Sequence, residues 1–300
     1  MEAWIVISVA AAAFQTLRFM LQKHLSTAAL STGGATFARF IYSMPFIVSL
    51  AIGYLVWTGA PVPEFSLRFW VFALSGGLAQ ILATWCVVAL FAQRNFAVGI
   101  TFKKTEVMQT ALVGLLVLGD RISTLGFLAI VTGLVGVLIL SDTPTVSGAW
   151  HRRIMNRAAG LGLLSGLCFS FSAVGYRGAI LEIASDDALL RAGVTLAIVT
   201  TTQAIGMSIW LAWREKGEIA RVIAARHTAV WMGITGMLGS LCWFTAFTLQ
   251  NAAYVFAVGQ IEVIFSLAAS VLFFGETIAR REVMGIALIT LSVIAVGFFL

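Results

Sequence analysis

The stretch FKKTEVMQTALVGLLVLGD, residues 102–120, places three charged side chains beside a long apolar run. Lys103, Lys104 and Glu106 stand within four residues, and the preceding NFAVGI, residues 95–100, is mostly apolar as well. A charged side chain at the centre of a bilayer costs roughly 2.5–3.5 kcal/mol, so such residues usually face the protein interior or a water-filled cavity. The stretch therefore predicts a membrane helix whose charged residues serve a purpose inside the protein.

The composition of the whole chain agrees with a membrane location. Of its 300 residues, 60% are hydrophobic and 11% are charged, and its mean hydropathy is +0.98. Soluble domains are about 45–50% apolar and about 25% charged. The net charge of +6 resides mostly in short loops between apolar runs, where topology accounts for it without a nucleic-acid partner. We predict an all-α integral protein of the inner or plasma membrane.

The N-terminus and the cysteines add little further chemistry. The opening MEAWIVISVAAAAF contains Glu2 and no basic segment, so it is expected to remain as a transmembrane helix rather than a cleaved signal peptide. Cys86, Cys168 and Cys242 lie within apolar runs and lack the spacing of metal ligands. We expect packing residues there, with no disulfide, no metal and no cofactor.

The apolar runs predict ten transmembrane helices, since about 20 residues are needed to cross the hydrocarbon. The predicted spans are 4–21, 34–57, 69–92, 96–118, 123–140, 157–181, 188–212, 228–248, 252–274 and 281–299.

The two halves of the chain repeat one pattern. Glu106-Val107 and Glu262-Val263 are separated by 156 residues, and the same offset joins Cys86 to Cys242. The predicted units are residues 1–141, a polar linker at 142–157, and residues 158–300. Each unit has an odd number of spans, so the two copies would cross the membrane in opposite directions. Inverted repeats of this kind are typical of secondary transporters, with a site near the bilayer midplane.

A family resemblance rests on the end of the fourth span in each half. LVLGDRIS, residues 116–123, and LFFGETIA, residues 272–279, each end an apolar span in glycine and an acidic residue. With two five-helix halves, this resembles the EamA repeat of the ten-helix branch of the drug/metabolite transporter superfamily. The resemblance implies secondary transport, often export, of small metabolites such as amino acids. It departs from the family at Val107 and Val263, where many members have proline.

The orientation of the chain has two readings. Family members usually have both termini in the cytoplasm. The loops after the odd-numbered spans carry most of the loop lysines and arginines, and the positive-inside rule would then place both termini outside.

The polar residues within the spans are the candidate site. In a helix over 96–118, Lys103, Glu106 and Thr110 would share one face. Positive charge exceeds negative charge near the midplane of the first half, which favours a carboxylate-bearing substrate. The predicted substrate-binding residues are Gln15, Arg18, Lys103, Lys104, Gln109, Tyr176 and Trp243.

The acidic residues of the spans are candidates for proton coupling. Burial favours the neutral form of a carboxyl group, so Glu262 and Glu106 are predicted to take up and release protons. Arg39, Asp120 and Glu276 are predicted to be structural, the latter two as cap or turn residues. Structural alternatives also exist for the functional candidates: Lys103 could simply pair with Glu106, and Glu262 could be a hydrogen-bonded structural residue.

Together these features predict a secondary transporter, most simply a monomer, that exports a small anionic or zwitterionic metabolite by alternating access. Membrane lipid and protons are the other expected partners. A lipid or polyprenyl carrier and a cationic-drug exporter are the alternatives within the same fold, and a passive channel is another. Enzyme motifs such as HExxH and GxSxG are missing from the sequence, and His24, His151 and His227 all fall in predicted loops.

Overall fold

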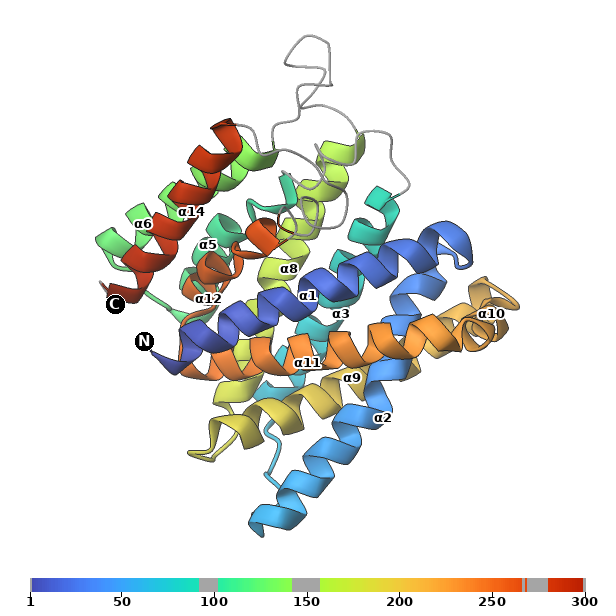
Figure 1. The fold of residues 1–300 in the computed structure, drawn as a ribbon. Coiled ribbons are helices and arrows are strands. Elements are labelled where there is room, and N and C mark those ends of the chain that lie inside the picture. Colours follow the sequence, from blue (N-terminus) through green and yellow to red (C-terminus); the bar gives the residue numbers. More distant parts are fainter. Residues whose placement is uncertain (1, 92–101, 142–156, 266–267, 269–279, 299–300) are drawn as a thin grey trace.

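The computed structural model describes residues 2–91, 102–141, 157–265, 268 and 280–298, and within these residues all regular structure is helical. Figure 1 shows the arrangement. The helices of the first half are α1 (Ala3–Ala28), α2 (Thr32–Thr58), α3 (Leu67–Phe91), α5 (Glu106–Leu118) and α6 (Thr124–Ser141). Those of the second half are α8 (Arg157–Leu181), α9 (Ala188–Arg214), α10 (Glu218–Ala224), α11 (Arg226–Leu249), α12 (Ala252–Gly259) and α14 (Arg280–Phe298).

Six of these helices are long and apolar enough to cross a membrane. They are α1, α2, α3, α8, α9 and α11, and each matches a predicted span. The described parts of the other four predicted spans form shorter apolar helices, at Glu106–Leu118, Thr124–Ile139, Ala252–Phe265 and Val283–Ala295. The predicted class, an all-α multi-pass membrane protein, is confirmed, whereas the number of ten spans stays a prediction.

The ends of the long helices follow local capping rules. The Ser31 side chain accepts a hydrogen bond from the Gly34 amide at the start of α2, and Gly59 ends that helix in the left-handed conformation. Asp187 accepts hydrogen bonds from the Leu189 and Leu190 amides at the start of α9. Such caps satisfy backbone groups that a helix end leaves without partners.

The prediction of one continuous helix over 96–118 is wrong within the described residues 102–118. Residues 102–103 are helical, residues 104–105 form a turn, and α5 begins only at Glu106. In the second half, α12 ends at Gly259, residues 260–261 form a turn, and helix resumes over 262–265. The two turns are separated by the same 156-residue offset that relates Glu106 to Glu262. Neither turn contains proline.

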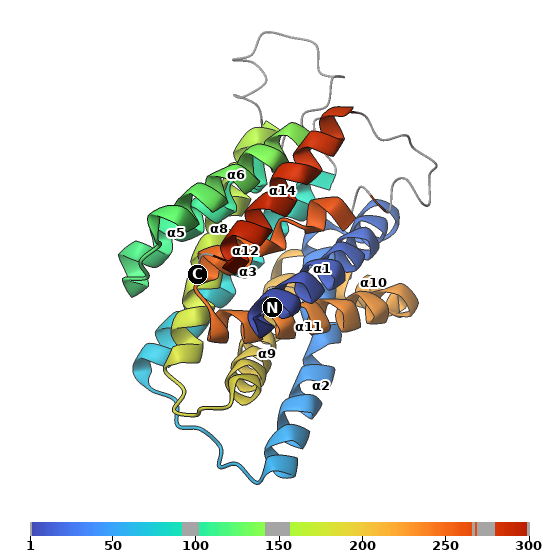
Figure 2. The same ribbon diagram turned by 60° about the vertical axis from the view of Figure 1, so that its left-hand side comes forward.

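Several of the most extensive helix contacts join helices that correspond between the two halves of the chain. α1 lies beside α11, and α3 lies beside α8, as Figures 1 and 2 show. Exchanging corresponding helices converts the first pair into the second. The pairs α2–α9, α5–α12 and α6–α14 each join corresponding helices. The α3–α8 contact is close: a Cβ added at Gly175 would lie only 3.0 Å from the Gly76 Cα. Glycine at both positions permits this approach, as small residues do between membrane helices.

Polar contacts join the two halves at both ends of α2. At its start, the Ser31 amide donates to Glu218 Oε1 at 2.6 Å, and the Ser31 hydroxyl donates to Glu215. Near its end, the Tyr54 hydroxyl donates to Asp187 Oδ2 at 2.7 Å. The first set connects the α1–α2 loop to the α9–α10 connection, and the second connects α2 to the α8–α9 loop.

Candidate functional site

Two buried lysine–glutamate pairs lie at the helix breaks. Lys103 Nζ lies 2.8 Å from Glu106 Oε1, and Lys104 Nζ lies 3.3 Å from Glu262 Oε2. The first pair is local, and it is the contact that the ion-pair alternative for Lys103 predicts. The second joins the two halves, because Lys104 comes from the first break and Glu262 from the second. Both predicted lysines therefore have a carboxylate partner.

Gln15 of α1 connects the second pair to an aromatic residue. Its Nε2 donates to Glu262 Oε2 at 2.8 Å, and its Oε1 accepts from Trp243 Nε1 at 3.1 Å. One amide thus ties α1 to the second helix break and to α11. The carboxylate of Glu262 receives hydrogen-bond donors from both Lys104 and Gln15.

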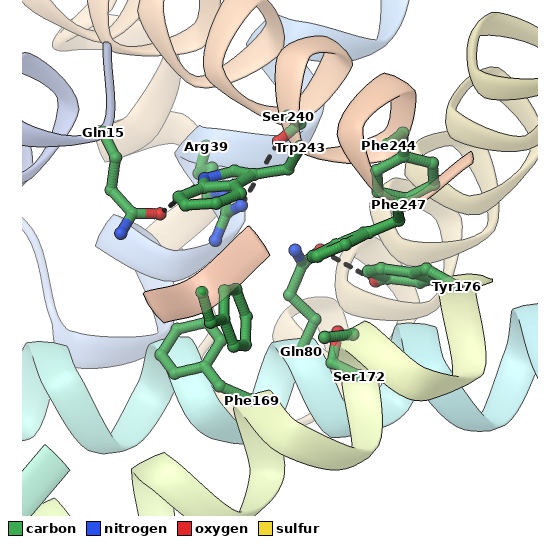
Figure 3. A pocket seen from close by; sticks show the side chains of 12 residues that line it. Gln15, Arg39, Gln80, Phe169, Ser172, Tyr176, Ser240, Trp243, Phe244 and Phe247 are labelled. Carbon is green, nitrogen blue, oxygen red and sulfur yellow. Dashed lines mark hydrogen bonds between the residues drawn. The ribbon is translucent and has the colours of Figure 1, made fainter. Parts of the chain in front are cut away.

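Two adjoining cavities lie next to these residues. The first has an empty volume of about 370 Å³ and is shown in Figure 3. The second has an empty volume of about 280 Å³ and reaches the charged residues Lys103, Glu106 and Glu262. The residues that line both cavities are Gln15, Phe169, Trp243 and Phe256.

Aromatic rings form much of the wall of the first cavity. The ring centres of Tyr176 and Phe244 are 4.5 Å apart, and Phe256 lies 5.4 Å from Trp243 and 5.6 Å from Phe247. These rings come from α8, α11 and α12, so the wall is assembled from the second half. Figure 3 shows Phe169 on the opposite side of the cavity from Trp243.

A hydrogen-bonded group of Tyr176, Gln80 and Gln203 holds one side of this cavity. The Tyr176 hydroxyl donates to Gln80 Oε1 at 2.9 Å, and Gln203 Nε2 lies 2.9 Å from the same oxygen. Gln203 Nε2 also donates to the Gly77 carbonyl at 2.9 Å. Since buried polar groups need partners, this network fixes the orientation of Tyr176 between α3, α8 and α9.

Arg39 lines the first cavity, although the sequence predicts a structural residue there. Its Nη1 donates to Thr84 Oγ1 at 2.9 Å, and its Nη2 lies 3.5 Å from Ser240 Oγ. The bond to Thr84 does tie α2 to α3, in keeping with the structural prediction.

The other predicted residues lie away from the two cavities. Arg18 is fully enclosed and donates to Gln22 Oε1 at 2.7 Å. Gln109 faces an apolar groove between α5 and α6. Asp120 Oδ2 accepts from Arg177 Nε at 3.1 Å, while the Arg177 Nη1 donates to the Phe247 and Gln250 carbonyls at the end of α11. Glu276 lies outside the described residues.

Several lining residues escape the sequence analysis. Gln80, Ser172 and Ser240 line the first cavity beside Arg39, and Gln203 orients the tyrosine. The sequence feature that could have identified them is a polar side chain within an apolar run, which Gln80 and Gln203 both show. That signal does not say which of many such residues face a common space.

Comparison with known proteins adds a family and a fold. Residues 156–298 match the model of the EamA-like transporter family. No curated protein matches the chain. Among solved structures, one described only as "Crystal structure of protein" is 14% identical, with a TM-score of 0.71. The match covers 99% of this chain and 96% of that chain, so the likeness in fold extends over both halves.

Proposed function

The chain belongs to the EamA-like transporter family, and from that premise we propose that it is a secondary transporter of a small anionic or zwitterionic metabolite, such as an amino acid. Export is the direction that we expect, across the inner or plasma membrane and by a monomer. The observation that carries the proposal is the buried Lys104–Glu262 pair, which joins the two halves beside two cavities.

We propose that the substrate crosses the membrane by alternating access, in which two inverted repeats move against each other. The exchange symmetry of the packing supports this proposal, as do the two helix breaks at corresponding positions. Discontinuous helices at a repeat interface are typical of transporter sites. Rocking of one half against the other would expose the cavities to one side at a time.

Coupling to protons would act through Glu262. When the carboxylate accepts a proton, its attraction for the Lys104 ammonium is lost, and the link between the two helix breaks weakens. Release of the proton restores the pair. Glu106 is the second candidate, although its lysine comes from the same break and its titration would not change a contact between the halves.

Transport by the reconstituted protein tests this proposal. Unfolding midpoints in detergent should first be compared with pyruvate, leucine and choline, because a bound ligand stabilises the folded state by mass action. A pH gradient across proteoliposomes should then drive accumulation of the compound that binds. Stabilisation by choline alone would contradict the anionic or zwitterionic class.

The Glu262→Gln variant addresses the coupling residue. We expect it to exchange substrate across the membrane without responding to the pH gradient, because a glutamine cannot titrate. Glu182→Gln is a matched control. Glu182 does not line the two cavities, and its Oε1 lies 3.8 Å from Nη1 of the exposed Arg68. A normal gradient response in Glu262→Gln, with loss in Glu106→Gln, would transfer the role to Glu106.

A lipid carrier is a second candidate because of a groove between α5 and α6. The groove has an empty volume of about 1440 Å³ and is lined mainly by apolar side chains, with Gln109, Asp120, Arg121 and Thr124 as polar members. Transbilayer movement of a fluorescent phospholipid in proteoliposomes, without exchange of pyruvate or leucine, would favour this alternative.

A further inference from the structure

The charges buried at the centre of the protein do not balance within the described residues. The cations are Arg18, Arg39, Lys103 and Lys104, and the carboxylates are Glu106 and Glu262. Each lysine takes one of the glutamates. Both arginines are left with neutral hydrogen-bond partners in the described part of the chain. Because a buried charge is costly unless it is paired, this arrangement calls for an anion beyond those that the described residues supply.

Arg39 has the capacity and the position to receive that anion. A guanidinium has five N–H donors, and Arg39 makes one short bond, to Thr84, and one at the outer limit of hydrogen-bond distance, to Ser240. The residue is 5% exposed and lines the first cavity. Figure 3 shows Arg39 among the residues that line this cavity, with its bond to Ser240 drawn as a dashed line.

Arg18 has the same charge but not the same access. Its guanidinium lies 4.1 Å from the centre of the Phe19 ring, and its Nη2 has no hydrogen-bond partner among the described groups. It is not among the lining residues of either cavity. A Cβ on Gly236 would lie 3.1 Å from the Arg18 Cδ and 3.7 Å from the Arg39 Cγ. The two arginines thus approach the same glycine, and their repulsion increases the need for an anion near them.

The rest of the first cavity is suited to an apolar group. Phe169, Phe244, Phe247 and Phe256 line it, and its polar lining is uncharged apart from Arg39. The carboxylates Glu106 and Glu262 face the second cavity. The first cavity therefore offers one cation, Arg39, in a lining that is otherwise aromatic, apolar or uncharged polar.

We propose that Arg39 is the anchor for the substrate, binding the carboxylate of a small monocarboxylate whose apolar body packs against Phe169, Phe247 and Phe256. This inference rests on the proposed transport function and narrows its substrate class. Lys103 and Lys104 remain paired with their glutamates when the substrate is bound. The binding step and the coupling step thus use different cations.

The test is binding of 4-methylpentanoate to the full-length protein in detergent, measured by calorimetry and by the unfolding midpoint. The neutral analogue 4-methylpentanamide has the same apolar body without the charge. We expect the carboxylate to bind and the amide not to bind. Arg39→Gln should raise the Kd of the carboxylate by about 10- to 100-fold, the range for loss of a charge-assisted hydrogen bond. Arg39→Lys should recover part of the affinity. It replaces Arg39→Gln as the test variant if the glutamine variant does not fold.

The comparison with Arg18→Gln locates the site. Arg18 is an equally buried arginine outside the cavity, so a larger loss in Arg39→Gln than in Arg18→Gln supports the proposal. Equal affinity in wild type and Arg39→Gln would overturn it, as would a loss confined to Arg18→Gln.

Failure of this inference can be separated from failure of the transport proposal. If 4-methylpentanoate does not bind while pyruvate or leucine is transported in response to a pH gradient, the inference is wrong and the transporter remains. If no member of either set is bound or transported, both proposals are overturned. Phe169→Ala supplies a second readout, because it should weaken binding of 4-methylpentanoate more than binding of pyruvate.

Discussion

At the scale of single residues, the Lys104–Glu262 pair is the contact whose disruption we expect to cost the most stability. Both side chains are buried, and the amide of Gln15 shares the carboxylate. Removing one partner of a buried pair leaves the other charge uncompensated, whereas removing both can be nearly neutral. Stability and coupling therefore depend on the same two side chains.

We predict that Lys104→Met lowers the free energy of unfolding by about 3–5 kcal/mol, because it leaves Glu262 without its cation. Adding Glu262→Gln to that variant should recover most of the loss. Chemical denaturation in detergent of the wild type, both single variants and the double variant gives the coupling energy. Additive losses in the double variant would mean that the pair contributes no interaction of its own.

At the scale of helices, the two breaks place a carboxylate at the start of a helix. Glu106 is in the first turn of α5, and Glu262 begins the helical residues 262–265. A helix N-terminus favours negative charge, so each break places its glutamate where a carboxylate suits the helix dipole. Val107 and Val263 follow the acidic residues, so proline is not what breaks these helices.

The start of α9 provides a prediction outside the membrane spans. The hydrogen bond from the Tyr54 hydroxyl lowers the pKa of Asp187 from its ordinary value, assisted by the Leu190 and Leu189 amides. A lowered pKa in the folded state contributes stability above the unfolded pKa, and this contribution is lost as the pH falls through the folded pKa. Asp187→Ala should therefore cost about 1 kcal/mol at neutral pH, as for other N-caps.

The same cost should shrink on acidification, because protonation weakens the acceptor in the wild type. Unfolding midpoints of wild type and Asp187→Ala at pH 7 and at about pH 2, below the usual range of aspartate, measure the difference. An equal difference at both pH values would show that the carboxylate charge does not matter to the cap.

At the scale of the whole molecule, the two halves are held together at both ends of α2. The contacts of Ser31 with Glu215 and Glu218 connect the halves at one end, and Tyr54 with Asp187 connects them at the other. Gly34 allows the first contact, since a Cβ at that position would overlap the Glu218 carboxylate. Alternating access requires at least one of these contacts to separate during the cycle.

We predict that linking Ser31→Cys to Glu215→Cys with a short, reducible bifunctional thiol reagent stops transport, because it joins the halves at that end. The native Cys86, Cys168 and Cys242 should first be replaced by alanine. Exchange of substrate by proteoliposomes, before and after reduction, is the measurement. Treated single-cysteine variants control for simple modification, and full activity in the linked protein would contradict movement at this end.

The sequence by itself determined the class of the protein and much of its local structure. Hydropathy and helix length are properties of contiguous residues, so α1, α2, α3, α8, α9 and α11 lie where the apolar runs predict them. Lys103 and Glu106 are three residues apart, and their pairing could also be foreseen locally. Gln15, Tyr176 and Trp243 could also be chosen from the sequence, because each places a polar group within an apolar span and such a group needs a partner.

Only the tertiary structure decided which of these residues meet. Lys104 and Glu262 are 158 residues apart in the sequence, and no periodicity relates them. Arg39 has the same sequence signature as an anchoring arginine, yet the packing of α2 against α3 and α11 turns it toward a cavity. The physical reason is that hydrophobicity places helices in a membrane but does not select their neighbours. That selection comes from side-chain packing and from the pairing of buried charges across the two halves.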